Sequence, residues 1–208
     1  MDIKRVAIID YGMGNIWSVS SALKYLGVEA VLVTESERLI DFDYVILPGV
    51  GSFKKGMEKL QQRGFDVNLH KVAKRGTNIL GICLGMQLLG SHSTEDGNTG
   101  GLGLVCNKIE KFNFTDSAKF KIPHVGFNSV SVKDGTGLFN GLPESADFYF
   151  THSYRMSIEN FEGNHVVCNY GTEFLAAFEY GNICGTQFHP EKSQTNGLVL
   201  LKNFLSKK

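Results

Sequence analysis

The first half of the chain alternates short apolar runs with segments in which apolar residues recur at helical spacing. The apolar runs predict buried strands at residues 5–9, 29–33, 43–49 and 77–82. The helical spacing predicts helices at residues 15–27, 54–62 and 67–75, the first with Asn15 as its N-cap and Gly27 as its stop. Strands that alternate with helices favour right-handed crossovers and a parallel sheet covered by helices on both faces.

The second half has a different pattern. Gly, Asn and Asp separate short β-like runs at residues 104–112, 129–133, 147–154, 165–170, 174–180 and 183–188, which predict antiparallel and mixed β-structure. Leu198, Leu201 and Leu205 then follow at helical spacing and predict a closing helix. No composition shift divides the chain. We therefore expect one α/β domain over residues 1–208, with a central, mostly parallel sheet flanked by helices and an added antiparallel portion.

Charge and cysteine content exclude several classes of protein. Among 208 residues, 21 Lys and Arg balance 21 Asp and Glu, which gives no support to nucleic-acid or membrane-surface binding. The four cysteines form no C-x-x-C pair, and the chain is too long for a disulfide-stapled scaffold, so reduced thiols are expected. The N-terminal residues lack the pattern of a signal peptide, and no apolar run reaches membrane-spanning length. We expect a cytoplasmic protein.

One cysteine lies between two glycines where a predicted strand gives way to a helical segment. Gly81-Ile82-Cys83-Leu84-Gly85 is the thiol counterpart of the nucleophile elbow G-x-S-x-G. Glycines relieve crowding at a sharp turn, and the helix N-terminus that follows favours a thiolate. The N–H of Leu84 would point toward a developing oxyanion. The pentapeptide alone fits a buried structural cysteine equally well. The remaining cysteines, Cys106, Cys168 and Cys184, are expected to pack in the core.

A candidate base and its orienting group lie together near the C-terminus. His189 and Glu191 are two residues apart, and Pro190 favours extended geometry at His189, so both side chains are expected on one side of an extended segment. They could then meet a thiol as a unit. The alternative is that H-P-E occurs by chance in a solvated loop. This alternative is weaker because the cysteine motif is present in the same protein. His70, His92 and His165 are expected at the surface, whereas His124 and His152 occupy more unusual contexts.

Two glycine-containing loops are candidates for anion binding. The loop 47–53, LPGVGSF, leaves backbone amides that could supply a second oxyanion donor, although an ordinary loop explains this peptide alone. Gly12 and Gly14 begin a dinucleotide fingerprint, but Trp17 replaces its third glycine, so a nicotinamide site is not expected. No Cys or His spacing fits zinc. The sequence therefore predicts neither cofactor nor metal.

Together these motifs resemble the class I (triad) glutamine amidotransferases. Within that family the chain is similar to the glutaminase subunits of imidazole glycerol phosphate synthase, which belong to histidine biosynthesis. The shared motifs are IIDYGMGNIWSV, LPGVGSF, GICLGMQLL, IPHVGFN, FTHSY and FHPEKSQTNGLVLLKNF, from about residue 8 to 204. GICLGMQ and HPE are specific for the superfamily, whereas YGMGN, PHxG and HPEKS narrow the resemblance to this subunit.

The resemblance implies hydrolysis of glutamine to glutamate and ammonia. Cys83 would form a γ-glutamyl thioester, His189 would move protons and Glu191 would orient His189. The amides of Val50 and Leu84 would hold the oxyanion, and the loop 49–51 could need a peptide flip to do so. Residues that match glutamine-holding positions of relatives are Gly51, Gln87 and the backbone of Ser153 and Tyr154.

The resemblance also implies a partner. Because the glutaminase motifs occupy the chain, ammonia is expected to pass to a (β/α)₈ barrel synthase subunit in a heterodimer. Phe127, Tyr149 and Lys192 match positions that contact the synthase in relatives. Phe127 is a departure, because the usual motif is P-H-M-G-W-N and this chain has PHVGFN. The departure leaves open a paralogous subunit that supplies ammonia for an amidino-sugar in surface-polysaccharide biosynthesis.

Two other classes of function are weighed against this one. A flavodoxin-like small-molecule binding module would share the fold without the chemistry, and a chromophore bound to the purified protein would indicate it. A cysteine hydrolase of another γ-glutamyl amide would act without a partner.

Overall fold

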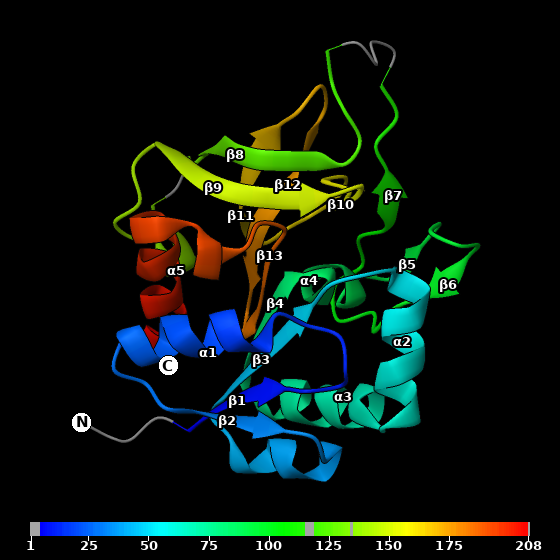
Figure 1. The fold of residues 1–208 in the computed structure, drawn as a ribbon, viewed down its shortest axis with the longest axis vertical. Helices are drawn as coiled ribbons and strands as arrows, with labels where there is room; N and C mark the ends of the chain where they lie inside the picture. Colours follow the sequence, from blue (N-terminus) through cyan, green and yellow to red (C-terminus); the bar gives the residue numbers. More distant parts are fainter. Residues whose placement is uncertain (1–4, 115–118, 134, 208) are drawn as a thin grey trace.

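The computed structural model describes residues 5–114, 119–133 and 135–207 and forms two sheets (Figure 1). The large sheet has nine strands in the order β2-β1-β3-β4-β13-β12-β11-β8-β9, and the small one has the order β10-β7-β5-β6. The large sheet is flanked by helices and is parallel at one end and antiparallel at the other. The predicted fold class is confirmed.

The parallel end of the large sheet comes from the first half of the chain and one late strand. Its strands are β2 (Ala30–Val33), β1 (Val6–Ile9), β3 (Tyr44–Gly49), β4 (Asn78–Cys83) and β13 (Ile183–Thr186). Along β1, Val6 and Ile8 enter one core cluster while Ala7 and Ile9 enter the other. Because both faces are buried, the central strands have continuous apolar runs rather than alternating ones.

Helices cover both faces of this sheet. α1 (Ile16–Tyr25) and α5 (Gln194–Ser206) lie on one face, and α2 (Phe53–Gln62) and α3 (Phe65–Arg75) lie on the other (Figure 1). Leu23 of α1 and Phe204 of α5 share a buried cluster, and Leu60 of α2 and Leu69 of α3 share the second. The predicted helices all form, with ends that shift by at most two residues. No helix in the described ranges is long and apolar enough to cross a membrane.

Both residues that were predicted to end α1 flank the helix in the structure. Gly27 follows the helix with φ +78°, a left-handed conformation that suits a glycine stop. Asn15 occupies the N-cap position, but its side-chain oxygen accepts a hydrogen bond from the Ser18 hydroxyl at 2.9 Å instead of capping a backbone N–H. The predicted N-cap position of Asn15 is therefore confirmed, although its side chain makes no capping hydrogen bond.

The antiparallel end contains β12 (Glu173–Tyr180), β11 (Asn164–Asn169), β8 (His124–Ser131) and β9 (Ser145–His152). In the register of β8 with β9, His124 lies opposite His152 and Phe127 lies opposite Tyr149. Short helical segments are α4 (Leu84–Leu88), η1 (Ser36–Asp41), η2 (Gly137–Phe139) and η3 (Pro190–Lys192).

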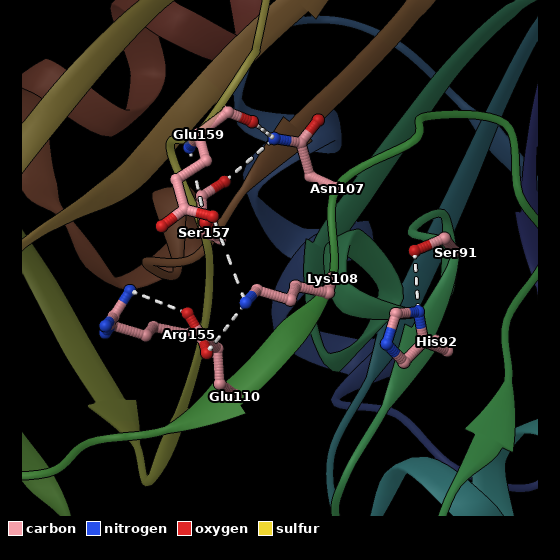
Figure 2. A network of polar contacts seen from close by, with 8 residues as sticks. All are labelled: Ser91, His92, Asn107, Lys108, Glu110, Arg155, Ser157 and Glu159. Atoms are coloured by element: carbon pink, nitrogen blue, oxygen red, sulfur yellow. Dashed lines mark hydrogen bonds and ion pairs between the residues drawn. The ribbon is translucent and has the colours of Figure 1, made fainter.

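The small sheet corrects one predicted strand. Its members are β10 (Tyr154–Met156), β7 (Ile109–Lys111), β5 (His92–Ser93) and β6 (Thr99–Gly100), so only the end of the expected strand 104–112 forms. The Asn107 side chain donates hydrogen bonds of 2.9 Å to the carbonyls of Ser157 and Glu159, where a strand would pair through its backbone (Figure 2). Arg155 also contacts Glu110 at 3.7 Å across β10 and β7. This polar network fixes β10, which begins at Tyr154.

Candidate active site

The sharp turn after β4 presents Cys83. Cys83 ends β4 and precedes α4 with φ 54° and ψ −111°, a backbone conformation that costs a non-glycine residue about 1–3 kcal/mol. A Cβ at Gly81 would lie 2.6 Å from the Met86 nitrogen, and one at Gly85 would lie 1.8 Å from the Leu47 carbonyl oxygen. The expected steric role of both glycines is confirmed. The turn can hold the strained cysteine because Gly81 and Gly85, two residues to either side of it, lack side chains.

His189 and Glu191 meet, although not through an extended segment. The His189 Nδ1 lies 2.8 Å from the Glu191 Oε1, and both side chains are almost fully buried. Residues Pro190–Lys192 form a 3₁₀ turn, which curls Glu191 back toward the ring of His189. The predicted extended geometry is therefore wrong beyond His189. Two contacts hold the backbone of His189: its N–H donates to the Tyr149 carbonyl at 2.9 Å, and its carbonyl accepts from the Ser193 hydroxyl at 2.6 Å.

The second ring nitrogen of His189 and the sulfur of Cys83 differ in their hydrogen bonds. Among the described residues, Nε2 of His189 is buried without a hydrogen-bond partner. The Cys83 sulfur donates to the Thr151 carbonyl at 3.9 Å and accepts from Nε2 of Gln187 at 3.8 Å. Burial lowers the pKa of His189, but interactions with Cys83 and Glu191 outweigh it and raise that pKa to about 9. A proton on this imidazole is therefore favoured beside the sulfur.

These groups line one cavity of about 390 Å³. Besides Cys83 and His189, the cavity brings together the predicted residues Val50, Gly51, Leu84, Gln87, Ser153 and Tyr154. Glu191 does not line it but lies behind His189. The structure thus collects the residues of the candidate site from four separate motifs.

Two further groups belong to this site and were missed from the sequence. Gln187 is fully buried, and its Oε1 accepts from Nε2 of Gln87 at 2.9 Å, while its own amide reaches Cys83. Its place two residues before His189 was an available signal. Glu95 lines the cavity and accepts the Phe53 N–H at 2.8 Å, and burial raises its pKa. Glu95 lies in a polar segment that carries no recognisable pattern.

The other cysteines divide into two groups. Cys168 and Cys184 are buried, as expected, and burial raises the pKa of each thiol to about 12. Cys106 is exposed, so the prediction of a core position is wrong for it. The physical reason is that residues 104–108 do not form the expected strand, which would have turned this side chain inward.

The histidines outside H-P-E also divide. His70 is exposed and His92 and His165 are half-buried, whereas His124 and His152 are buried and in contact. Nδ1 of His124 lies 3.0 Å from Nε2 of His152. His152 lines the cavity, so this pair adjoins the candidate site.

The residues expected at a partner contact gather on one face. The rings of Phe127 and Tyr149 meet edge-on with centroids 5.6 Å apart, and the Lys192 ammonium lies 5.7 Å from the centroid of Tyr149. Phe127 is 54% exposed. We call these three residues the Phe127 cluster. It lies on β8, β9 and the turn that holds Glu191, close behind the candidate site.

The site offers no metal centre. In residues 5–114, 119–133 and 135–207, no group of three or more His, Cys, Asp and Glu side chains is placed to hold a metal ion. The cavity offers a thiol, an imidazole that a buried carboxylate holds from behind, and a buried amide, a set suited to acyl transfer from an amide.

The comparisons agree with this chemistry. The model of the class I glutamine amidotransferase family matches residues 7–208. The chain belongs to that family and is a glutamine amidotransferase.

Its relatives place it more narrowly. The imidazole glycerol phosphate synthase subunit HisH 1 of Parasynechococcus marenigrum is 41% identical over 206 residues, covering 98% of each chain. HisH of Moorella thermoacetica is 43% identical over 202 residues, covering 97% of this chain and 94% of that protein. Among solved structures, PurLQS from Thermotoga maritima matches with a TM-score of 0.72 at 23% identity, covering 97% of both chains. That likeness shows the fold alone.

Proposed function

We propose that this chain hydrolyses glutamine to glutamate and ammonia through Cys83, His189 and Glu191. The observation that carries the proposal is the 2.8 Å contact of His189 with Glu191, which lies directly behind the cavity that His189 and the strained turn at Cys83 both line. A nucleophile and a base that line one cavity, with an orienting acid behind the base, are the elements of a triad.

The reaction follows from where these atoms lie. The Cys83 sulfur attacks the side-chain amide carbon of glutamine as a thiolate, since its proton resides on Nε2 of His189, whose pKa is raised to about 9. His189 returns that proton to the amide nitrogen, so that the C–N bond breaks and ammonia leaves a γ-glutamyl thioester. Water then attacks the thioester with His189 as base, which releases glutamate and the thiol. Glu191 holds Nδ1 throughout and stabilises the imidazolium.

Two backbone amides serve as oxyanion donors. Leu84 follows Cys83 at the first position of α4, so its N–H lies beside the reacting carbon. Val50 lines the same cavity and precedes Gly51, whose φ of +107° is open to glycine. Rotation of this glycine-flanked peptide would turn the Val50 N–H toward or away from the oxyanion.

The two ends of glutamine are held by different groups. Glu95 supplies a carboxylate for the α-ammonium group. The carbonyl of Ser153 already accepts from the Phe112 N–H, and that of Tyr154 accepts from Gln87. Ser153 and Tyr154 therefore serve the α-carboxylate through N–H groups rather than carbonyls. Gln87 uses both of its amide hydrogens on Tyr154 and Gln187, which leaves its oxygen to accept from the substrate.

The ammonia passes to a (β/α)₈ synthase subunit that forms a heterodimer with this chain and makes imidazole glycerol phosphate in histidine biosynthesis. Two observations support this: relatives about 40% identical over nearly their full length are HisH subunits, and the Phe127 cluster exposes an aromatic ring and a cation beside the site. Phe127 keeps the aromatic contact with Tyr149. The same residue is the observation that favours the second candidate, the amidino-sugar pathway.

The test is steady-state glutamate release by this protein alone, with a barrel subunit of the histidine pathway or of the amidino-sugar pathway, and with either barrel plus its acceptor ligand. We expect slow hydrolysis by the free chain and stimulation on the order of a hundredfold or more by the histidine-pathway barrel with ligand, the effect of one oxyanion donor. If the free protein hydrolysed glutamine as fast as the liganded complex, activation by the partner through the Val50 peptide would be contradicted. Stimulation by the polysaccharide-pathway barrel alone would move the chain to the second candidate. Partner-free hydrolysis of γ-glutamyl peptides would assign it to another class.

A further inference from the structure

The buried histidines His124 and His152, which the triad chemistry does not use, form a directed chain of hydrogen bonds. Nδ1 of His152 lies 2.8 Å from the Tyr154 carbonyl oxygen. A carbonyl can only accept, so Nδ1 of His152 carries the proton. In the neutral ring Nε2 is then an acceptor, and Nδ1 of His124, 3.0 Å away, must donate to it. Nε2 of His124 in turn accepts from the Asn128 amide at 3.4 Å.

Aromatic packing excludes water from these hydrogen bonds. The ring of His124 stacks between Phe150, with centroids 4.8 Å apart, and Tyr170, with centroids 3.9 Å apart. His152 contacts Phe112 and Phe174, each with centroids 5.2 Å away. The exposed fractions are 2% for His124 and 6% for His152. Both rings are held neutral, since burial lowers the pKa of His124 to about 4 and that of His152 to about 3.

This chain of hydrogen bonds ends at the carbonyl of Tyr154, a residue that lines the substrate cavity. The Tyr154 carbonyl accepts both from His152 and from Nε2 of Gln87, so one oxygen joins the histidine pair to the glutamine-side amide. The residues from Thr151 to Tyr154 all line the cavity, and the Thr151 carbonyl accepts from the Cys83 thiol. A shift of the Tyr154 carbonyl would therefore displace Gln87 and the segment that faces the substrate.

We propose that His124 and His152 are positioning residues for glutamine: as two Nδ1–H imidazoles in series they hold the Tyr154 carbonyl and the Ser153–Tyr154 segment in binding geometry. The inference rests on the proposed function, because that segment is assigned to the substrate. The pair has no free nitrogen for chemistry, since His152 uses both ring nitrogens within the chain. At its other end the chain reaches Asn128, next to Phe127, so the substrate segment is tied to the strand that carries the Phe127 cluster.

A matched pair of substitutions at His124 tests the proposal. His124→Phe keeps a ring between Phe150 and Tyr170 but cannot donate to His152. His124→Asn places an amide N–H where Nδ1 lies and restores the donor. In the complex with its barrel partner, we expect His124→Phe to raise the KM for glutamine about tenfold with kcat changed less than about threefold. His124→Asn should recover most of that loss.

A control separates positioning from general damage. Alkylation of Cys83 by iodoacetamide needs the thiol but not the glutamine pocket, so its rate should be unchanged in His124→Phe. A variant that lost kcat, alkylation rate and thermal stability together, with no rescue by His124→Asn, would assign the pair a purely structural role. A well-folded His124→Phe with the wild-type KM would also overturn the proposal.

A second measurement does not depend on activity. Imidazole nitrogen NMR of the ¹⁵N-labelled chain at pH 7 should show two buried histidines as neutral Nδ1–H tautomers, with the pair lost in His124→Phe. Nε2–H tautomers at these positions would refute the chain of hydrogen bonds, whatever the enzyme does. If the wild-type complex did not hydrolyse glutamine but both Nδ1–H signals were present, the proposed function would be refuted, whereas the chain of hydrogen bonds through His124 and His152 would be supported.

Discussion

Two buried histidine sites lie close together in this molecule and hold opposite charge states. Burial lowers the pKa at each of them, but interactions with Cys83 and Glu191 raise that of His189 to about 9, whereas His124 and His152 remain at about 4 and about 3. The difference lies in the companions: a carboxylate and a thiol at one site, another imidazole and a carbonyl at the other. The same residue type is thus suited to carry a proton at one site and to keep a fixed tautomer at the other.

The two sites also differ in how they are built. His189 and Glu191 are neighbours in sequence, and the Cys83 turn comes from five consecutive residues. The histidine pair exists only because β8 and β9 pair in a register that sets His124 opposite His152. A local motif carries its chemistry with it, whereas the pair depends on the antiparallel end of the sheet.

The first prediction challenges the division of labour between these sites. Cys83→Ala should lower glutamine hydrolysis by the complex at least about 10³-fold, because among the described residues that line the cavity only Cys83 carries a thiol. The measurement is glutamate release, alongside synthesis from added ammonium salts, which should survive. Cys106→Ala is the matched control, since Cys106 is exposed and does not line the cavity. A glutamine-mimicking electrophile that labelled Cys106, Cys168 or Cys184 would show that the nucleophile is misassigned.

The second prediction ranks the members of the charged site. His189→Ala should be nearly as inactive as Cys83→Ala. Glu191→Gln should be at least roughly tenfold more active than His189→Ala, since an orienting carboxylate contributes less than the base. Both should lose far more kcat than His124→Phe. The measurement is kcat in the complex, with circular dichroism as the check on folding. Equal losses for His189 and Glu191 in folded proteins would require another role for Glu191.

The third prediction concerns the turn itself. Gly85→Ala should destabilise the protein by about 3 kcal/mol or more, because its Cβ would lie 1.8 Å from the backbone oxygen of Leu47, which cannot move aside as a flexible side chain can. Gly100→Ala is the control, since no atom lies within 4 Å of the corresponding Cβ. Urea unfolding measures both. Equal stability of the two variants would show that the turn is not as crowded as the structure has it.

Most of the fold could be predicted because its determinants are local. Apolar runs and helical spacing identify the parallel strands and their helices, since each central strand is buried on both faces. Residues 104–108 could not be predicted, because the Asn107 side chain there replaces strand pairing with bonds to carbonyls some fifty residues later. Cys106 was misplaced for the same reason.

The candidate site shows the same limit. Cys83, His189 and Glu191 are visible because glycines and a proline mark them in sequence. Glu95 lies in a polar segment, and its approach to the cavity depends on the Phe53 N–H at the start of α2. Gln187 gains meaning only once β13 lies beside β4. Groups that act through tertiary hydrogen bonds leave no periodic trace, whereas groups held by a turn do.

The last prediction has the smallest effect and tests the opposite charge states directly. The folded pKa of His189 is raised above the ordinary 6.5, so its contribution to stability is complete below pH 6.5 and is lost as pH rises through about 9. For His124 and His152 the folded pKa is lowered, so their contribution is complete above pH 6.5 and is lost as pH falls toward about 4 and about 3. Other groups titrate in both ranges, so each variant is compared with the wild type across the pH series. Urea midpoints of His189→Gln should approach the wild type between pH 7 and 9.5, while those of His124→Phe should approach it between pH 6.5 and 4. Differences that stay constant with pH would show that the two sites do not differ in charge, and the comparison between them would fail.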